Sequence, residues 1–230
     1  PIYATPFTAY ILREKLREAD LLDEAKITEV PLGGTIELGP FKLELITLTH
    51  SIPEPNGLAI RTPLGTILHT GDWKIDPDPI IGEDFDQAKI EELGREGILA
   101  MVCDSTNVFE EGEAGSEGMA REALKRAVAE QTGRVAITSF ASNVARVQSA
   151  CEAAKANDRS VCLVGRSMLR IVGAAQSVGL LKGFDFIDPE DAADLPHSLD
   201  LLIDLEKVLG HRIKLDAVAA AKIGRASCRE

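Results

Sequence analysis

Two side chains that can bind metal ions follow two strand-like segments of the chain. His50 ends the first apolar run within residues 43–76, and Asp72 follows the last one across a Thr-Gly pair. A neutral imidazole and a carboxylate both ligate Zn or Mn, and a carboxylate can bridge two cations about 3.5–4 Å apart. The pattern indicates part of a metal site. The alternative is a buried histidine and an aspartate that caps a turn.

The elements that must position this pair are short strands. Three apolar runs within residues 43–76 are separated by turn residues, which is typical of three strands joined by loops. His50 and Asp72 then lie where a strand gives way to a loop, and a rigid sheet holds groups well at such places. Gly71 has no Cβ, so the backbone can turn and let Asp72 point back across the sheet end.

The segments around this pair carry a family resemblance. THSIP and HTGDWKID resemble two metal-binding motifs of the metallo-β-lactamase superfamily, and above all of its ribonuclease J branch, the prokaryotic β-CASP nucleases. The resemblance implies that His50 and Asp72 are metal ligands. His69 precedes the core of the second motif and is not implied as a ligand; we interpret it as packing or as support for the metal site.

The segment CDSTN is a second place where polar groups follow a strand pattern, here the apolar run 98–103, which predicts a buried strand. Asp104 can orient a ligand or carry a proton, and Ser105, Thr106 and Asn107 can donate hydrogen bonds to phosphate oxygens. The alternative is a loop that satisfies its own backbone. CDSTN resembles the β-CASP motif whose acidic residue lies beside the metal centre, which implies a catalytic role for Asp104.

Residues 116–178 alternate helices with strands, which predicts a parallel, doubly wound sheet. Two strand-to-helix junctions are polar, and helix N-termini attract anions. The segments SFASN and GRSM resemble the part of the ribonuclease J β-CASP domain that faces RNA, so Ser142, Asn143, Arg166 and Ser167 are candidates for RNA contacts. Ser142 and Ser167 are equally suited to cap the two helices.

The remaining periodicity and turn residues predict the other elements. Helices are expected over 6–23, 86–94, 116–131, 142–157, 167–178 and 199–209, and strands over 26–30, 35–38, 41–48, 98–103, 134–138 and 160–164. The first half therefore predicts a mostly antiparallel or mixed sheet.

The formal net charge of −12 is unevenly distributed. Residues 1–115 hold 9 Lys and Arg against 22 Asp and Glu, whereas residues 116–230 hold 16 against 15. The acidic half suits cations, and the neutral half leaves basic side chains for anionic partners. No basic stripe indicates nucleic-acid binding by charge alone.

The four cysteines form no CxxC pair. Cys103 and Cys162 lie in apolar runs and are predicted to be core residues, which favours a reducing compartment and a cytoplasmic location. No apolar run approaches the roughly 18 residues of a membrane span, so no membrane partner is expected.

The resemblance implies an α/β fold. Residues 1–107 would be part of a metallo-β-lactamase αββα sandwich, residues 108–196 part of an inserted, doubly wound β-CASP domain, and residues 197–230 an atypical tail. The His-x-His-x-Asp-His motif that supplies most ligands of the family is absent from the sequence. We therefore expect an internal fragment that is inactive alone, because a catalytic zinc needs at least three protein ligands.

The resulting hypothesis is a metal-dependent ribonuclease that hydrolyses RNA phosphodiesters, as an endonuclease or an exonuclease, in a full-length parent that forms a homo-oligomer. Two Zn ions are implied, with Mn or Mg as alternatives. One competing hypothesis is a hydrolase of the same fold that acts on a small ester or thioester. The other is a non-catalytic module that binds RNA or nucleotides.

Overall fold

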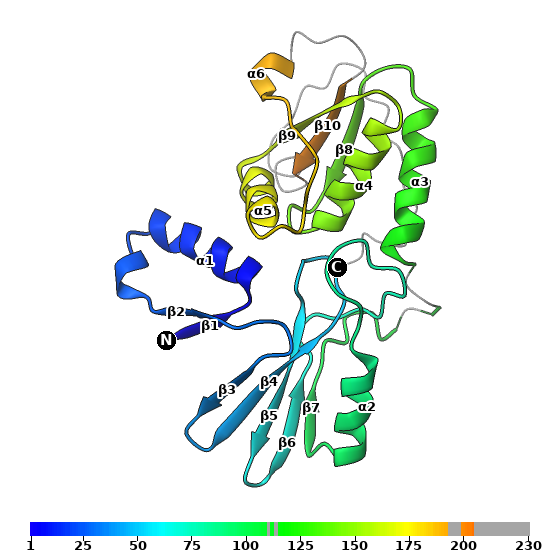
Figure 1. The fold of residues 1–230 in the computed structure, drawn as a ribbon. Coiled ribbons are helices and arrows are strands. Elements are labelled where there is room, and N and C mark those ends of the chain that lie inside the picture. Colours follow the sequence, from blue (N-terminus) through cyan, green and yellow to red (C-terminus); the bar gives the residue numbers. More distant parts are fainter. Residues whose placement is uncertain (110, 113–114, 193–198, 205–230) are drawn as a thin grey trace. The chain divides into compact units, whose positions relative to one another are not determined.

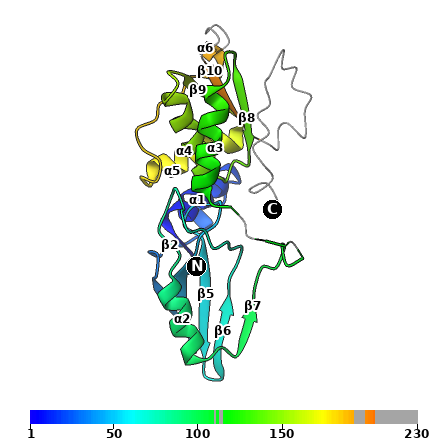
Figure 2. The same ribbon diagram turned by 90° about the vertical axis from the view of Figure 1, so that its right-hand side faces the viewer.

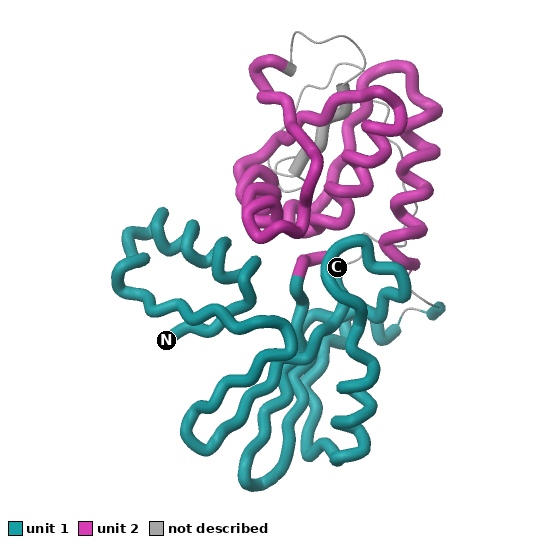
Figure 3. The backbone as a smooth tube through the Cα atoms, viewed as in Figure 1, with its two compact units in different colours: residues 1–50, 54–114, 230 teal, residues 51–53, 115–229 magenta. Residues whose placement is uncertain are grey.

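The computed structural model describes residues 1–109, 111–112, 115–192 and 199–204. The chain divides into two compact units. Unit 1 comprises residues 1–50, 54–114 and 230, and unit 2 comprises residues 51–53 and 115–229 (Figure 3). Within the described residues, no helix is both long and apolar enough to pass through a bilayer.

Unit 1 is built on a mixed five-stranded sheet with the order β3-β4-β5-β6-β7 (Figure 1). Its strands are β3 (Thr35–Leu38), β4 (Phe41–Thr47), β5 (Asn56–Thr62), β6 (Gly65–His69) and β7 (Ala100–Val102). The first three pairings are antiparallel and the last one is parallel. The predicted mixed sheet is confirmed.

The direction of these strands decides where their loops emerge. β4 and β6 are both antiparallel to β5, so they run the same way, and β7 is parallel to β6. The C-terminal ends of β4, β6 and β7 therefore lie at one edge of the sheet. The loops that carry His50, Asp72 and Asp104 leave the sheet at this edge.

The other elements of unit 1 are shorter. They are β1 (Ile2–Ala4), α1 (Pro6–Glu18), η1 (Leu22–Glu24), β2 (Ile27–Glu29) and α2 (Gln87–Glu96). β1 and β2 pair in parallel. The helix expected over 6–23 ends earlier, because Asp20 adopts a positive φ of 56° and a single 3₁₀ turn follows. α2 begins where it was predicted, since the side chain of Asp86 accepts a hydrogen bond from the Lys89 N–H.

The core of unit 1 lies between its sheet and α2, which runs beside the strands (Figure 2). Its buried members are contributed by β4, the residue after β4, β5, β6 and α2, in that order: Ile46, Leu48, Ala59, Leu68 and Leu93. Trp73 and Phe85 pack against this cluster with their ring centroids 6.4 Å apart. Since Trp73 adjoins Asp72, the core directly supports the loop that follows β6.

β7 corrects one expectation. The apolar run 98–103 was predicted to be a buried strand with Cys103 in the core, but Met101 is 49% exposed, Val102 is 54% exposed and Cys103 is exposed. β7 is the last strand of the described sheet, so it has a strand neighbour on one side only. Composition alone does not separate such an edge strand from a central one.

Unit 2 alternates helices with parallel strands. Its elements are α3 (Glu117–Ala129), β8 (Val135–Ser139), α4 (Val144–Lys155), β9 (Ser160–Val164), α5 (Arg166–Ser177), α6 (Pro189–Ala192) and β10 (Leu199–Asp204). The strand order is β8-β10-β9, and both pairings are parallel. The predicted parallel sheet is confirmed.

β10 overturns the helix expected over 199–209. Residues 199–204 form a strand that pairs on both sides, with Leu201 opposite Ala136 of β8 and Cys162 of β9. The remainder of that predicted helix lies outside the described residues. A short apolar run in the middle of a parallel sheet has no alternation, so periodicity does not separate it from a buried helix.

Candidate functional site

The loop after β4 is joined to the loop after β6. Thr49 and Lys74 form an isolated antiparallel bridge, in which the Lys74 N–H donates to the Thr49 carbonyl over 2.8 Å. His50 follows Thr49 directly, and Asp72 precedes Lys74 by two residues. The bridge thus brings both candidate ligands to the same junction.

The loop after β7 is joined to the same segment. The Thr70 hydroxyl accepts a hydrogen bond from the Asp104 N–H at 3.2 Å, and the Trp73 indole N–H donates to the Asp104 carbonyl at 3.2 Å. The Thr70 N–H donates to the Val102 carbonyl at 3.0 Å. Asp72 lies between Thr70 and Trp73, so a residue on each side of it is hydrogen-bonded to β7 or to the loop that follows β7.

His50, Asp72 and Asp104 therefore come from three connected loops at one sheet edge. Asp72 is exposed, and His50 and Asp104 are half-buried. Hydrogen bonds from the Thr106 hydroxyl and N–H hold the pKa of Asp104 below its ordinary value, and the charge of His50 contributes in the same direction. His50 thus lies within electrostatic range of Asp104.

Gly71 makes the turn that the sequence predicts. Its φ is +62°, and a Cβ placed there would meet only the Asn56 carbonyl oxygen, at 3.6 Å. Its N–H donates to Nδ1 of His69 at 3.0 Å. His69 is exposed, and its ring stabilises the turn by accepting this hydrogen bond.

The donor types at this edge suit zinc, but their number does not complete a site. Within the described ranges, no group of three or more His, Cys, Asp or Glu side chains is arranged to hold a metal ion. An imidazole and a carboxylate are ordinary zinc ligands, and at least one further protein ligand is needed. Among the described residues, the edge gathers two side chains of types that bind zinc but no complete ligand set.

The CDSTN loop shows both features that were weighed for it. The Asp104 carboxylate accepts hydrogen bonds from the N–H of Thr106, over 2.9 Å, and from its hydroxyl, so these two residues stabilise their own turn. Ser105, Thr106 and Asn107 are all exposed. Their polar groups lie on the surface beside the edge that carries the candidate ligands.

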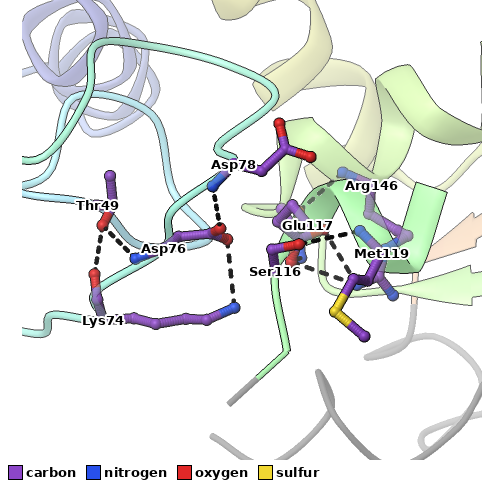
Figure 4. A network of polar contacts seen from close by, with 9 residues as sticks. Thr49, Lys74, Asp76, Asp78, Ser116, Glu117, Met119 and Arg146 are labelled. Carbon is purple, nitrogen blue, oxygen red and sulfur yellow. Dashed lines mark hydrogen bonds and ion pairs between the residues drawn. The ribbon is translucent and has the colours of Figure 1, made fainter. Parts of the chain in front are cut away.

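The α4 junction of unit 2 has a structural role that the sequence did not reveal. Asn143, not Ser142, caps α4 by accepting a hydrogen bond from the Arg146 N–H at 2.9 Å. Its amide donates to Glu117 at 3.5 Å, and Glu117 forms a buried ion pair with Arg146 at 3.1 Å (Figure 4). Asn143 is 6% exposed. The predicted cap at Ser142 is wrong. The buried side chain of Asn143 makes its hydrogen bonds to Arg146 and Glu117 inside the protein.

The α5 junction is more open. Gly165, with a φ of +125°, occupies the N-cap position, and no side chain caps this helix. The predicted cap at Ser167 is wrong, because Ser167 lies inside the first turn and cannot precede it. Arg166 is exposed at the first helical position, and Ser167 is half-buried. Of the two junctions, only the α4 junction has a side-chain cap.

Comparisons with known proteins agree on one family. Residues 132–204 match the family model of the ribonuclease J β-CASP domain. Ribonuclease J of Sinorhizobium meliloti is 48% identical over 183 residues, covering 80% of this chain and 32% of that protein. Ribonuclease J of Thermus thermophilus is 40% identical over 206 residues, covering 88% of this chain and 36% of that protein.

A solved structure shares the fold. The crystal structure of a protein of unknown function from Enterococcus faecalis V583 superposes with a TM-score of 0.58 at 19% identity, covering 89% of this chain and 53% of that chain. The chain spans about a third of the length of the curated relatives it matches. On the family match and these relatives together, the chain belongs to the ribonuclease J family.

Proposed function

We propose that this chain forms part of a metal-dependent ribonuclease that hydrolyses RNA phosphodiester bonds. The activity belongs to the whole protein, meaning a protein of the relatives' length that contains this chain. The observation that carries the proposal is the attachment of the loops of His50, Asp72 and Asp104 to one another at a single sheet edge. The chain's membership of the ribonuclease J family supports the class of reaction, hydrolysis of RNA.

His50 and Asp72 would hold metal at this edge, with the remaining ligands supplied by residues outside the described part of the chain. Bound zinc, two ions in this proposal, lowers the pKa of water and stabilises negative charge on a phosphoryl oxygen. Mn and Mg are the alternatives. Asp72, exposed on a loop attached at both ends, can offer both carboxylate oxygens. Asp104 would orient water or a ligand beside it.

RNA contacts are proposed for both units separately. In unit 1, the exposed residues Ser105, Thr106 and Asn107 follow Asp104, at the sheet edge proposed to bind metal. They can donate hydrogen bonds to phosphate oxygens. In unit 2, the exposed guanidinium of Arg166 can form a forked pair with a phosphate at the N-terminus of α5.

The other predicted contacts of unit 2 carry less weight. Ser167 and Ser142 are half-buried, and Asn143 would contribute through the helix that it caps. Residues 1–107 are proposed as the metallo-β-lactamase part, with its αββα sandwich, and residues 108–196 as the β-CASP part. The family match over residues 132–204 favours extending the β-CASP part to the end of β10.

The test of the metal edge uses the whole protein with His50→Ala and Asp72→Asn. We expect each variant to lose bound zinc, measured by elemental analysis, and to lose cleavage of single-stranded RNA. Asp78→Asn is a matched control that should keep its zinc. Unchanged metal content and cleavage in both His50→Ala and Asp72→Asn would overturn the proposal.

The RNA contact at α5 is tested by Arg166→Ala. We expect weaker RNA binding, with the salt dependence of binding reduced by the equivalent of about one phosphate contact, and unchanged zinc content.

If RNA binding persists in EDTA while wild-type protein cleaves no RNA in zinc, the competing hypothesis of a non-catalytic binding module is favoured instead. Cleavage of a thioester without cleavage of RNA would favour the small-substrate hydrolase.

A further inference from the structure

A closed set of hydrogen bonds joins the two loops that carry the candidate ligands (Figure 4). The Asp76 N–H donates to the Thr49 hydroxyl at 3.0 Å, and that hydroxyl donates to the Lys74 carbonyl. The Lys74 N–H in turn donates to the Thr49 carbonyl at 2.8 Å. Thr49 is thereby bound to the loop after β6 through its hydroxyl as well as its backbone.

The carboxylate of Asp76 is buried and already engaged by the protein. Asp76 is 6% exposed and Thr49 is 3% exposed. One carboxylate oxygen pairs with the Lys74 ammonium group at 3.4 Å, and the other accepts the Asp78 N–H at 3.0 Å. These partners favour one conformation of the turn 74–78, because a conformation that kept the carboxylate buried without them would leave its charge uncompensated.

We propose that Asp76 and Thr49 are positioning residues that set the spacing between His50 and Asp72. The proposal deepens the proposed function and rests on it. Thr49 adjoins His50, and the chain from Asp72 to Asp76 is short, so a shift of the 74–78 turn displaces one ligand relative to the other. Neither residue needs to touch the metal.

The size of the expected effect follows from how strictly metal sites depend on geometry. Ligands must be held within about 0.5 Å of their productive positions, and the loss of a residue that orients a ligand lowers metal affinity or activity by about 10–100-fold. Asp72 is exposed, so burial of its own side chain does not fix it. The hydrogen bonds of Thr49 to Asp76 and Lys74 add a constraint on Asp72 relative to His50, besides the contacts of Thr70 and Trp73 with Asp104.

The experiment compares Thr49→Val, Thr49→Ser and Asp76→Asn in the whole protein. Valine keeps the shape of threonine without its hydroxyl, whereas serine keeps the hydroxyl. We expect Thr49→Val and Asp76→Asn to bind zinc about 10-fold more weakly or worse in competition with a chelator, and Thr49→Ser to bind like wild type. Asp78→Asn removes the same charge from the same turn, and it should also bind like wild type.

Two further readouts separate positioning from a general loss of structure. Cobalt substituted for zinc should give altered visible absorption bands in Thr49→Val, while circular dichroism and the melting temperature confirm that the variant is folded. If folded Thr49→Val has wild-type zinc affinity and cobalt spectra while His50→Ala loses zinc, the positioning role is overturned and the proposed metal site is not. Equal weakening by Thr49→Val and Thr49→Ser would also overturn it, since the hydroxyl would then be irrelevant.

Discussion

Glu54 caps helix α1 from 47 residues further along the chain. Its carboxylate accepts a hydrogen bond from the Phe7 N–H at 2.9 Å, and Thr5, the N-cap residue, makes no side-chain cap of its own. Glu54 adopts a φ of +56° and lies four residues after His50. The loop that carries His50 is therefore attached at one end to Lys74 and near its other end to α1.

This cap predicts a loss of stability on Glu54→Ala. Removing a helix N-cap costs about 1 kcal/mol, and a carboxylate also interacts favourably with the positive end of the helix dipole. Glu54→Gln keeps an oxygen acceptor and should lose less. The free energy of unfolding in urea measures both variants, and equal losses for Gln and Ala would show that the cap is not the cause.

Glu44 predicts a stability difference that depends on pH. Burial would raise the pKa of Glu44, but hydrogen bonds from Lys89 and Arg61, with their positive charges, outweigh it and lower the pKa below the ordinary value of 4.5. The Lys89 ammonium lies 3.0 Å from the carboxylate. A lowered pKa means that the folded state favours the ionised carboxylate, so this stabilisation is present at neutral pH and is lost as the pH falls through the folded-state value.

We therefore expect Glu44→Gln to destabilise the protein at pH 7 by about 1.5–3 kcal/mol, the range for a hydrogen bond to a charged group. The difference from wild type should shrink once the pH is below 4.5. Urea unfolding across this pH range is the measurement. Glu37→Gln, an exposed glutamate of the same sheet, is the control, and a deficit that stays constant with pH would contradict the ion-pair explanation.

The buried pair Glu117–Arg146 predicts a large loss on Arg146→Ala. The side chain of Arg146 is 5% exposed and that of Glu117 is 8% exposed, so removing Arg146 leaves the charge of Glu117 in the interior at a cost of about 3–5 kcal/mol. The double variant Glu117→Gln with Arg146→Met should recover part of this loss. No recovery in urea unfolding would mean that packing, not charge, dominates at this position.

The cysteines predict a pattern of chemical labelling. Burial raises the pKa of the Cys151 thiol to about 12 and also raises the pKa of Cys162, whereas Cys103 is exposed. Only the thiolate reacts with iodoacetamide. Peptide mapping of the native protein should find Cys103 alkylated and Cys151 and Cys162 unmodified, whereas Cys228 lies outside the described residues. Modification of Cys151 before unfolding would contradict the structure.

Local signals in the sequence predicted much of this fold. Asp86 and Ser116 were expected at helix starts, and both accept a hydrogen bond from the N–H three residues on. This interaction depends only on neighbouring residues, so it can be inferred without the rest of the chain. The edge that gathers His50, Asp72 and Asp104 was likewise expected from strand ends, although their roles as ligands and catalyst stay predictions.

The failures share a physical origin. β7 has an apolar sequence but a strand neighbour on one side only among the described strands, and residues 199–204 pair with two strands that are distant in sequence. The placement of Asn143, fixed by Glu117 and Arg146, depends on contacts between α3 and α4. In each case the deciding contact joins segments that are distant in the sequence, and local propensity does not predict such contacts.

The position of β10 bears on how unit 2 can be made. β8 and β9 leave the ribosome first, yet in the described sheet each pairs with β10 and not with the other. In a nascent chain that has not yet reached residue 199, the edges of β8 and β9 that pair with β10 are therefore unpaired. Pairing them requires contacts of long sequence separation, which slow folding. A chain truncated before residue 199 lacks β10, the strand that pairs with both β8 and β9.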